Sequence, residues 1–385
     1  MYKRKIDITA QHNETFFLWG SRQTGKSTLL KERFPDALSV NLLNSRQYAK
    51  YSRDPHILHE EVTALSRPPS RIIIDEIQKI PALLDEVHLM IEELKIPFGL
   101  CGSSARKVRR GHANLLGGRA LRFELFGLVS CEVGADFNLE KFINVGVLPF
   151  HYNSKQPRKF LESYIADYLR EEIANEGLVR NLPAFSDFLR VAAVGDTEIL
   201  NYENVARECG VSATTVKGYY EILQDTLLGA LVPAYAKRPK RRVIQTPKFY
   251  FRNVGVVNTL LKRKLLTPEG ELFGKALENW CLHEISAHSA YSESSYDIRY
   301  WRLASGIEVD FILGEGTSAI EIKGTDRIRE HHLNGLIAFQ EEYPEVKERI
   351  VVCLEEKERR LGNGILICPV KEFLQRLWRN EIPVE

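Results

Sequence analysis

A glycine-rich segment near the amino terminus constrains the fold of this chain more than any other feature. Residues 20–27 read Gly-Ser-Arg-Gln-Thr-Gly-Lys-Ser and match the pattern G-x-x-x-x-G-K-[ST]. An apolar stretch at 15–19 predicts a strand before this loop, and residues 28–32 predict a helix after it. Glycines let such a loop curl so that its N–H groups and the helix N-terminus face a phosphate. The sequence therefore predicts a phosphate-binding loop in a doubly wound parallel α/β sheet.

The side chains of this loop define an expected nucleotide site. Lys26 is expected to reach the β- and γ-phosphates, and the Ser27 hydroxyl is expected to hold Mg²⁺. The predicted cofactors are ATP and Mg²⁺. The predicted nucleotide contacts are Gly20, Ser21, Arg22, Gln23, Thr24, Gly25, Lys26, Ser27, Thr28 and, further along the chain, Ser103.

A second apolar segment ends in two acids. Residues 71–76 read Arg-Ile-Ile-Ile-Asp-Glu, and the β-branched run indicates a strand buried on both faces of a parallel sheet. Asp75 is expected to belong to the Mg²⁺ shell, and Glu76 to orient or deprotonate the attacking water. The alternative is an ordinary strand that ends in solvated acids.

A third strand is expected at residues 98–101, followed by Gly102-Ser103-Ser104. A hydroxyl at this point could contact the γ-phosphate or the attacking water. The choice between Ser103 and Ser104 stays open from the sequence.

Composition and cysteine usage limit the class of protein. The 385 residues allow two or three domains, and a net charge of +2 with 27% charged residues leaves only local clusters to indicate nucleic acid. No apolar run approaches the roughly 18 residues of a membrane span, and no apolar segment follows the basic amino terminus as in a signal peptide. Six scattered cysteines without C-x-x-C pairs favour buried free thiols in a reducing cytoplasm.

The order of expected elements divides this α/β chain into three parts. A nucleotide domain is expected over 1–150, a helical lid with a winged helix-turn-helix over 151–265, and a second α/β domain over 266–385. In the last part the sequence predicts helices at 271–289, 328–343 and 370–380. Its strands are expected at 296–303, 308–313, 319–322, 349–354 and 365–368.

Residues 202–226 resemble a helix-turn-helix, with a Gly-Val-Ser turn at 210–212 in which Ser212 is a good N-cap. Ala206, Val211, Val216 and Leu223 are spaced to pack the two helices together. The side chains expected to face a nucleic-acid groove are Thr214, Thr215, Lys217 and Tyr219.

Five of the six residues at 237–242 are Lys or Arg, which is typical of a wing that contacts phosphate. DNA is therefore a predicted partner. The alternatives are a helix pair that serves packing or a protein contact, and a solvated basic loop.

Carboxylates gather in the C-terminal part. In the segment Glu308-Val309-Asp310-Phe311 the two acids share one face of a strand, opposite the apolar residues that face the core. Glu321 and Lys323 share a face of the next strand, and the turn at 314–318 brings them near Asp310. Asp310 and Glu321 could hold Mg²⁺, and Lys323 could position or deprotonate a water that attacks a phosphodiester.

A further metal-binding carboxylate could come from the preceding helix, either Glu278 or, as the alternative, Glu284. A strand hairpin of the form D-x₁₀-E-x-K after a Glu-bearing helix resembles the PD-(D/E)xK nuclease fold. A solvated hairpin or an inactive relic of that fold would show the same short pattern.

Taken together, the chain resembles a family of prokaryotic AAA-type (AAA+) ATPases that have a winged helix-turn-helix and a C-terminal PD-(D/E)xK-like domain. Besides the phosphate loop, the resemblance rests on Asp75 to Pro81, Gly102 to Arg106, Gly117 to Ala120, Leu277 to Asn279 and Glu308 to Phe311.

This resemblance implies an arginine, just before the last core strand, that acts in trans on a neighbour's γ-phosphate. Arg119 matches the position and Arg106 is the second candidate, so a homo-oligomer, often a ring, is implied. Cys101 departs from the family, which often has Thr at this position.

Three functions compete. The first is an ATP-driven enzyme that acts on DNA and cuts it with the C-terminal domain. The second is a signalling or scaffold ATPase whose C-terminal fold binds a partner without cleaving it. The third is a nucleotide-dependent transcription regulator. The intact set of Asp310, Glu321 and Lys323 favours the first, with Glu76 and Arg119 as the catalytic residues of the ATPase.

Overall fold

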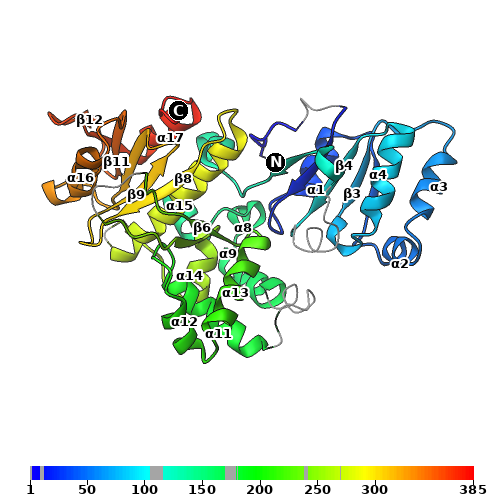
Figure 1. The fold of residues 1–385 in the computed structure, drawn as a ribbon, viewed down its shortest axis with the longest axis horizontal. Helices are drawn as coiled ribbons and strands as arrows, with labels where there is room; N and C mark the ends of the chain where they lie inside the picture. Colours follow the sequence, from blue (N-terminus) through cyan, green and yellow to red (C-terminus); the bar gives the residue numbers. More distant parts are fainter. Residues whose placement is uncertain are drawn as a thin grey trace. The chain divides into compact units, whose positions relative to one another are not determined.

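The computed structural model describes residues 2–8, 13–104, 116–169, 179, 181–237, 242–268 and 270–385. The chain forms two compact units, labelled by element in Figure 1. The first contains Lys3–Gly127 and Asp225–Leu227. The second contains Tyr2, Leu128–Gln224 and Leu228–Glu385. The predicted three-part division at residues 150 and 265 stays a prediction.

The first unit is built on a five-stranded sheet in which every pair of neighbours is parallel. The carboxyl ends of its strands therefore meet at one edge, as expected for a doubly wound fold. The strand order is β2 (Leu38–Asn41), β3 (Ile72–Asp75), β4 (Phe98–Gly102), β1 (Thr15–Trp19) and β5 (Ala120–Glu124).

Short helices follow these strands, including the helix expected after the phosphate loop. They are α1 (Lys26–Arg33), α2 (Ser45–Arg53), α3 (Ile57–Thr63), η1 (Ile77–Lys79), α4 (Leu83–Leu94) and η2 (Leu116–Gly118). The β-branched run of β3 is buried on both faces, as predicted, and shares a core with Phe17, Phe98 and Leu100.

The second unit begins with helices and a small hairpin. They are α6 (Ser130–Val133), η3 (Gly134–Asp136), α7 (Leu139–Val145), α8 (Pro149–Asn153), α9 (Pro157–Ser163), η4 (Tyr164–Leu169), α11 (Leu182–Val194), α12 (Tyr202–Cys209), α13 (Ala213–Asp225), β6 (Gly229–Val232), β7 (Lys248–Phe251) and α14 (Val254–Leu260).

Helices α12 and α13 lie over the residues expected for the two helices of the helix-turn-helix. Ser212 Oγ accepts a hydrogen bond from the Thr215 N–H at 3.1 Å, which confirms the predicted N-cap. Thr214 and Lys217 are exposed, but the expectation for Tyr219 was wrong. This side chain is buried, with its ring centroid 5.0 Å from that of Phe185, because it lies one turn after the core residue Val216 on the same helix face.

The residues on either side of the basic segment are attached to the C-terminal sheet. Ala234 forms a bridge with Tyr300 and Val243 with Leu303, so both flanks of the segment pair with β8, the edge strand of the C-terminal sheet. An edge strand offers unpaired backbone groups, which explains this attachment. Lys237 is exposed and contacts Glu315 at 3.3 Å. Arg238, Lys240 and Arg241 lie outside the described residues.

The C-terminal part is a mixed six-stranded sheet between helices. Its elements are α15 (Glu271–Tyr291), β8 (Ile298–Arg302), β9 (Glu308–Leu313), β10 (Ser318–Ile322), η5 (Glu330–Leu333), α16 (Asn334–Glu342), β11 (Glu348–Cys353), β12 (Arg359–Arg360), β13 (Leu366–Pro369) and α17 (Val370–Trp378). All five predicted strands are confirmed, with ends displaced by one or two residues. The sheet order is β12-β13-β11-β10-β9-β8.

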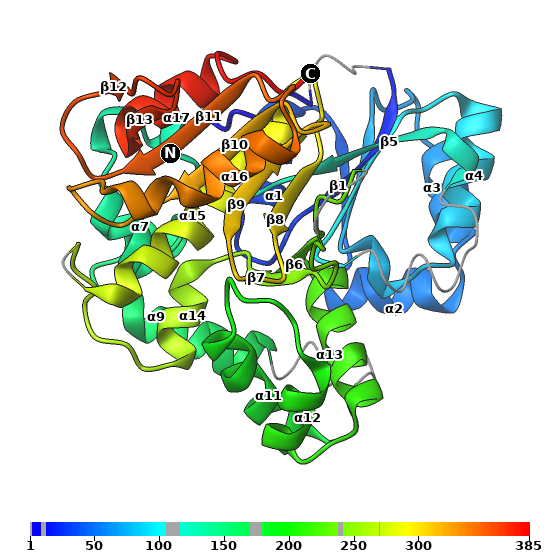
Figure 2. The ribbon, with the colours of Figure 1, turned by 60° about the vertical axis from the view of Figure 1, so that its left-hand side comes forward.

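Helices cover both faces of this sheet. Figure 2 shows α16 lying across β9 and β10, where Phe339 packs with Val309 and Val351. Helices α15 and α17 share the other core, which includes Ile320 and Val352. The predicted free thiols are confirmed for all six cysteines, of which Cys131 is exposed. None of the described helices is long and apolar enough to cross a membrane.

Candidate nucleotide site and carboxylate cluster

The phosphate loop joins β1 to α1 at the carboxyl edge of the first sheet. Gly25 is the N-cap of α1 with a φ of 97°, a left-handed conformation that favours glycine. A Cβ atom at Gly20 would lie 2.6 Å from the carbonyl oxygen of Leu125. Both glycines of the motif are therefore required by the backbone.

The Lys26 and Ser27 side chains of the loop both make close polar contacts at this edge. The Lys26 ammonium is buried and donates to the carbonyl oxygens of Gly20 at 2.6 Å and Ser21 at 3.1 Å. Ser27 Oγ donates to Asp75 Oδ2 at 2.6 Å. The hydroxyl from the loop and the carboxylate from β3 are thus already adjacent, as Mg²⁺ coordination by both requires.

The other predicted loop residues differ in exposure. Arg22, Gln23 and Thr28 are exposed, and Ser21 is half-buried. Thr24 is buried, with its hydroxyl donating to the Ser21 carbonyl at 2.9 Å. The residues fit ATP–Mg²⁺, since hard oxygen ligands, a loop lysine and a helix N-terminus converge at one edge. The bound metal would neutralise phosphate charge during hydrolysis.

Glu76 follows β3 in a left-handed conformation, with a φ of 60°. Such a conformation is strained for a side chain other than glycine and is often found at functional sites. Its carboxylate accepts a hydrogen bond from Gln78 Nε2 and lies 3.5 Å from Ser103 Oγ. Ser103 and Ser104 are both fully buried. Ser103 thus lies beside the expected catalytic carboxylate.

Gln78 is a residue that the sequence interpretation missed. Its amide nitrogen donates to Glu76 and, at 3.1 Å, to Ser103 Oγ, so it links the ends of β3 and β4. A Cβ atom at Gly102 would clash with Gln78 Oε1 at 2.1 Å, so glycine makes room for this amide. The sequence offered one signal for Gln78 as a site residue, namely that it is polar and lies two positions after Glu76.

Arg4 was also missed, because the amino terminus was interpreted only as basic. Its guanidinium donates to the carbonyl oxygens of Thr24 and Phe126, both at 2.6 Å, and of Gly127 at 3.0 Å. This side chain therefore ties the amino-terminal segment to the phosphate loop. No short motif in the sequence signals such a contact.

Cys101 donates its thiol hydrogen to Asp75 Oδ1 at 2.7 Å. Burial, and next the negative charge of Asp75, raise the pKa of the Cys101 thiol well above its ordinary value. The thiol is thus a neutral donor that orients the Asp75 carboxylate. This contact gives a physical role to the cysteine at this position.

Arg119 lies at the other edge of the sheet. Ala120 pairs with Thr15, whereas the phosphate loop begins after Trp19, about 13 Å further along β1. The exposed Arg119 guanidinium is paired with Glu92 of α4 at 2.7 Å. This placement gives no contact with the nucleotide site of its own subunit, and action in trans stays a prediction. Arg106 lies outside the described residues.

In the C-terminal sheet, β9 and β10 are antiparallel, with Leu313 paired to Ser318 at one end and Phe311 paired to Ile320 at the other. At the next position Asp310 Oδ2 accepts a hydrogen bond from the Ile322 N–H at 2.8 Å. Asp310 and Glu321 are thus neighbours, as the hairpin predicted. The expectation that Val309 and Phe311 face one common core was wrong, because they belong to different cores, and Asp310 and Glu321 are both buried.

Glu321 is paired with Lys323, whose Nζ lies 2.5 Å from Glu321 Oε1. Glu321 Oε2 is buried and has no hydrogen-bond partner among the described residues. Burial and the charge of Asp310 raise the pKa of Glu321. Burial alone would lower the pKa of Lys323, but Glu321 and Asp310 raise it above its usual value. Lys323 is therefore a charged donor here, which disfavours its predicted role as a base.

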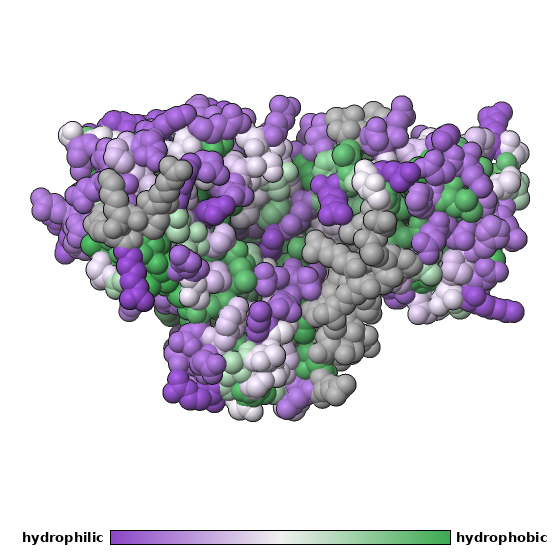
Figure 3. Space-filling model, in the orientation of Figure 1, coloured by the Kyte–Doolittle hydropathy of each residue, from purple (hydrophilic) through white to green (hydrophobic). Residues whose placement is uncertain are grey.

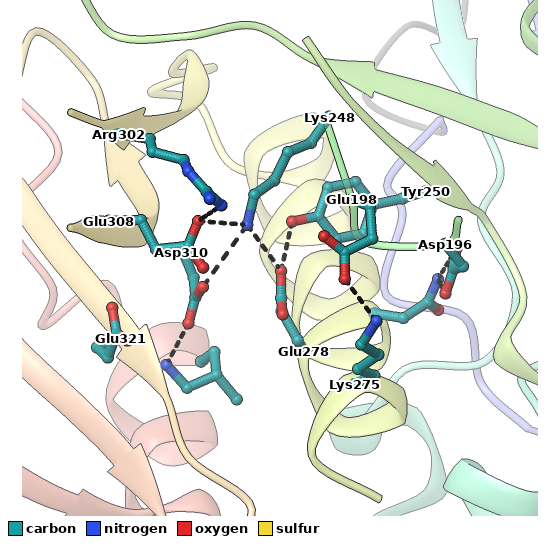
Figure 4. Close-up of polar contacts among 12 residues, drawn as sticks. Asp196, Glu198, Lys248, Tyr250, Lys275, Glu278, Arg302, Glu308, Asp310 and Glu321 are labelled. Atoms are coloured by element: carbon teal, nitrogen blue, oxygen red, sulfur yellow. Dashed lines mark hydrogen bonds and ion pairs between the residues drawn. The ribbon is translucent and has the colours of Figure 1, made fainter. Parts of the chain in front are cut away.

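A buried lysine that the sequence interpretation missed lies among the carboxylates (Figure 4). Lys248, the first residue of β7, has 3% of its side chain exposed. Its Nζ is 3.5 Å from Glu278 Oε1, 3.8 Å from Glu308 Oε2 and 3.8 Å from Asp310 Oδ1. Burial alone would lower the pKa of Lys248, but Glu278, Asp310 and Glu308 raise it, so the ammonium stays charged.

The structure separates the two candidate glutamates of α15. Glu278 belongs to the cluster and accepts a hydrogen bond from the Tyr250 hydroxyl at 2.6 Å. Glu284 instead accepts bonds from the Ser130 N–H at 2.7 Å and the Trp378 indole at 2.8 Å. Glu284 therefore stabilises the junction of α6, α15 and α17 and is not part of the cluster.

The cluster, as it stands, does not fit a divalent cation. In the part of the chain that the structure describes, one set of three His, Cys, Asp or Glu side chains brings its ligand atoms within 4.8 Å of one another. That set is His56, His59 and Glu86 in the first unit. The carboxylates Glu278, Asp310 and Glu321 surround lysine ammonium groups instead.

The parallel sheet, the loop and the adjacent Ser27 and Asp75 are the features of a P-loop nucleotide-binding domain. Residues 12–133 match the family described as AAA domain. Residues 136–267 and 273–373 match two domains of unknown function, DUF8612 and DUF4143.

Two curated relatives have the same degree of similarity. The uncharacterized proteins Mb2031c of Mycobacterium bovis and Rv2008c of Mycobacterium tuberculosis are each 25% identical over 300 residues. The match covers 76% of this chain and 66% of each relative.

A solved structure from Pyrococcus horikoshii, a signal transduction ATPase with numerous domains and a tetratricopeptide repeat sensor, is 14% identical. The match covers 75% of this chain and 47% of that one, with a TM-score of 0.22. A likeness at this TM-score supports no conclusion about function.

Proposed function

We propose that the first unit binds ATP–Mg²⁺ at the phosphate loop and hydrolyses it. The observation that carries this proposal is the 2.6 Å hydrogen bond between Ser27 and Asp75, which joins the loop to the end of β3. Glu76 lies at the same edge, where it can orient or deprotonate a water. The hydrogen bonds that Glu76 accepts from Gln78 and Ser103 support this role.

The test is ATP binding and steady-state hydrolysis by three variants. Lys26→Ala is expected to lose binding, because the phosphates lose their fixed cation. Glu76→Gln is expected to keep binding and lose turnover. Lys31→Ala, an exposed lysine on the same helix α1, serves as the control and should behave like the wild type. Wild-type turnover by Glu76→Gln would show that this carboxylate is not the base.

We further propose that this ATPase acts on DNA and works as a homo-oligomer. The exposed Thr214 and Lys217 of α13 and the basic run at 237–242 support a nucleic-acid contact. Figure 3 shows a hydrophilic surface over α12, where Glu203 and Glu208 accompany Arg207, so phosphate binding is expected from α13 and the basic run.

DNA binding of this kind depends on salt. Each neutralised phosphate contributes a slope of about −0.9 to the log–log plot of affinity against salt on duplex DNA. Replacing the five Lys and Arg residues of 237–242 by Ala should flatten this slope and weaken binding to all sequences alike. An unchanged slope would favour the scaffold alternative, in which the C-terminal domain binds a partner other than DNA.

The arrangement of the C-terminal domain argues against metal-dependent cleavage, because lysine ammonium groups lie among its carboxylates where a metal ion would bind. The same observation favours the alternative function. In that alternative the protein is a signalling or scaffold ATPase whose nuclease-like C-terminal fold binds a partner without cutting it.

A further inference from the structure

The carboxylate cluster of the C-terminal sheet holds its own cations. Lys248, Lys323 and Arg302 pair with four carboxylates, those of Glu278, Glu308, Asp310 and Glu321. Lys248 is the most central of the three, because its ammonium lies within 4.0 Å of three different carboxylates. It also comes from a separate element, β7 of the small hairpin, whereas the acids come from α15, β9 and β10.

We propose that the Lys248 ammonium is the resident cation of this cluster and that it excludes a divalent cation such as Mg²⁺ or Mn²⁺. A divalent cation binds between Asp310 and Glu278 only when Lys248 is removed from the cluster. The site is distinct from the nucleotide site, so the inference does not rest on ATP hydrolysis.

The first argument is geometric. Mg²⁺ needs oxygen ligands at about 2.1 Å. The carboxylate oxygens lie 3.5 to 3.8 Å from Lys248 Nζ, which is the spacing of ammonium–carboxylate contacts. A metal at the same place would displace the ammonium and draw the acids inward. Both cations cannot occupy the position together.

The second argument is electrostatic. Buried carboxylates are stable only when cations or hydrogen bonds compensate them. Tyr250 and Lys248 provide this compensation for Glu278, and the Ile322 N–H and Lys248 provide it for Asp310. Loss of Lys248 leaves both acids without their cation, and a divalent ion is the compensation that a solution can supply.

The third argument concerns access. The Lys248 side chain is 3% exposed, and its backbone is held in β7 and in a bridge with Ile199. The ammonium is therefore held among the carboxylates and is not a mobile side chain at the surface.

The experiment compares thermal unfolding of the full chain with and without about 1 mM MnCl₂ in the absence of nucleotide. Lys248→Met removes the charge and keeps the buried stem of the side chain. Lys275→Met is the matched control, because Lys275 on α15 makes a half-exposed pair with Glu198 outside the cluster.

Mn²⁺ should raise the Tm of Lys248→Met by about 5 °C, since a ligand that binds only the folded state stabilises it. The wild type and Lys275→Met should lack this gain. Adding Asp310→Asn to Lys248→Met should abolish it. Mn²⁺ bound elsewhere, at Asp75 or at His56 and His59, affects all these proteins equally and cancels in the comparison.

Two outcomes would overturn the proposal. One is an Asp310-dependent Mn²⁺ effect in the wild type, which would show that the position is open. The other is a folded Lys248→Met protein that gains no Mn²⁺ binding. If Lys248→Met does not fold, Lys248→Gln keeps a neutral amide donor beside the acids. Counted by the Mn²⁺ electron paramagnetic resonance signal, it should bind one equivalent more than the wild type, and equal binding would reject the inference.

Discussion

At the end of β3, three side chains determine where the expected catalytic carboxylate lies. Glu76 has a left-handed backbone, so its side chain direction depends on the contacts that hold it. Gln78 donates to both Glu76 and Ser103 through one amide nitrogen. We therefore interpret Gln78 as a positioning residue for the proposed hydrolysis.

Gln78→Ala should lower kcat for ATP hydrolysis by about tenfold, or about 1.4 kcal/mol, while KM for ATP changes little. The reason is that Gln78 contacts the carboxylate and not the phosphate loop. The measurement is steady-state kinetics across pH, with Gln47→Ala of α2 as a control glutamine in the same unit. A loss confined to KM, or no loss, would contradict the positioning role.

Residue roles were predictable where a short motif fixes them. The proximity of Ser27 and Asp75 was predictable, because the loop and strand patterns alone place both at one sheet edge. Gln78, Arg4 and Lys248 were missed because each acts through contacts between elements that no local pattern encodes. Lys248 is the first residue of an apolar strand, and in the sequence it looks like an ordinary polar residue at a strand end.

At the scale of elements, the short helix α8 carries an unusual buried histidine. His151 is 1% exposed, and neither ring nitrogen has a hydrogen-bond partner among the described residues. Its ring contacts those of Phe150 and Tyr164. Burial lowers the pKa of His151 to about 4, so the imidazole is neutral in the folded protein at neutral pH.

A lowered histidine pKa means that the unfolded chain binds a proton more readily than the folded one. The stability that depends on neutral His151 is therefore present above pH about 6.5 and is lost as the pH falls toward 4. His151→Phe should remove this loss. Between pH 8 and pH 5 its free energy of unfolding should therefore fall by roughly 2 kcal/mol less than that of the wild type. Denaturant unfolding at both pH values measures it, with the exposed His331→Phe as control. An equal pH dependence in both proteins would rule out His151 as its source.

Strands and helices were predicted well because their patterns are local, as in β9 and α15. The bridges of Ala234 and Val243 were not predicted, because their partners Tyr300 and Leu303 come later in the chain. The burial of Asp310 and Glu321 was missed for a related reason. Alternation along β9 is interrupted by a register shift against β8, and alternation cannot predict that another element covers a face.

For the molecule as a whole, the position of Arg119 sets a condition on assembly. It lies at the amino edge of the sheet, opposite the edge that bears the phosphate loop. A catalytic role for Arg119 therefore requires a neighbouring subunit whose nucleotide site meets this edge. This geometry motivates a test with mixed subunits.

Arg119→Ala should keep ATP affinity and lose hydrolysis by about 10³-fold, because the arginine acts on transition-state charge. Glu76→Gln should also be inactive, through loss of the base. Mixing the two should restore part of the activity, since a mixed interface contains one site with both Glu76 and a partner's arginine. Arg122→Ala, an exposed arginine on β5, is the matched control and should be active alone. Hydrolysis measured across mixing ratios, with mass measured under ATP, decides the point. A monomeric mass with no recovered activity would show that Arg119 does not complete a shared site.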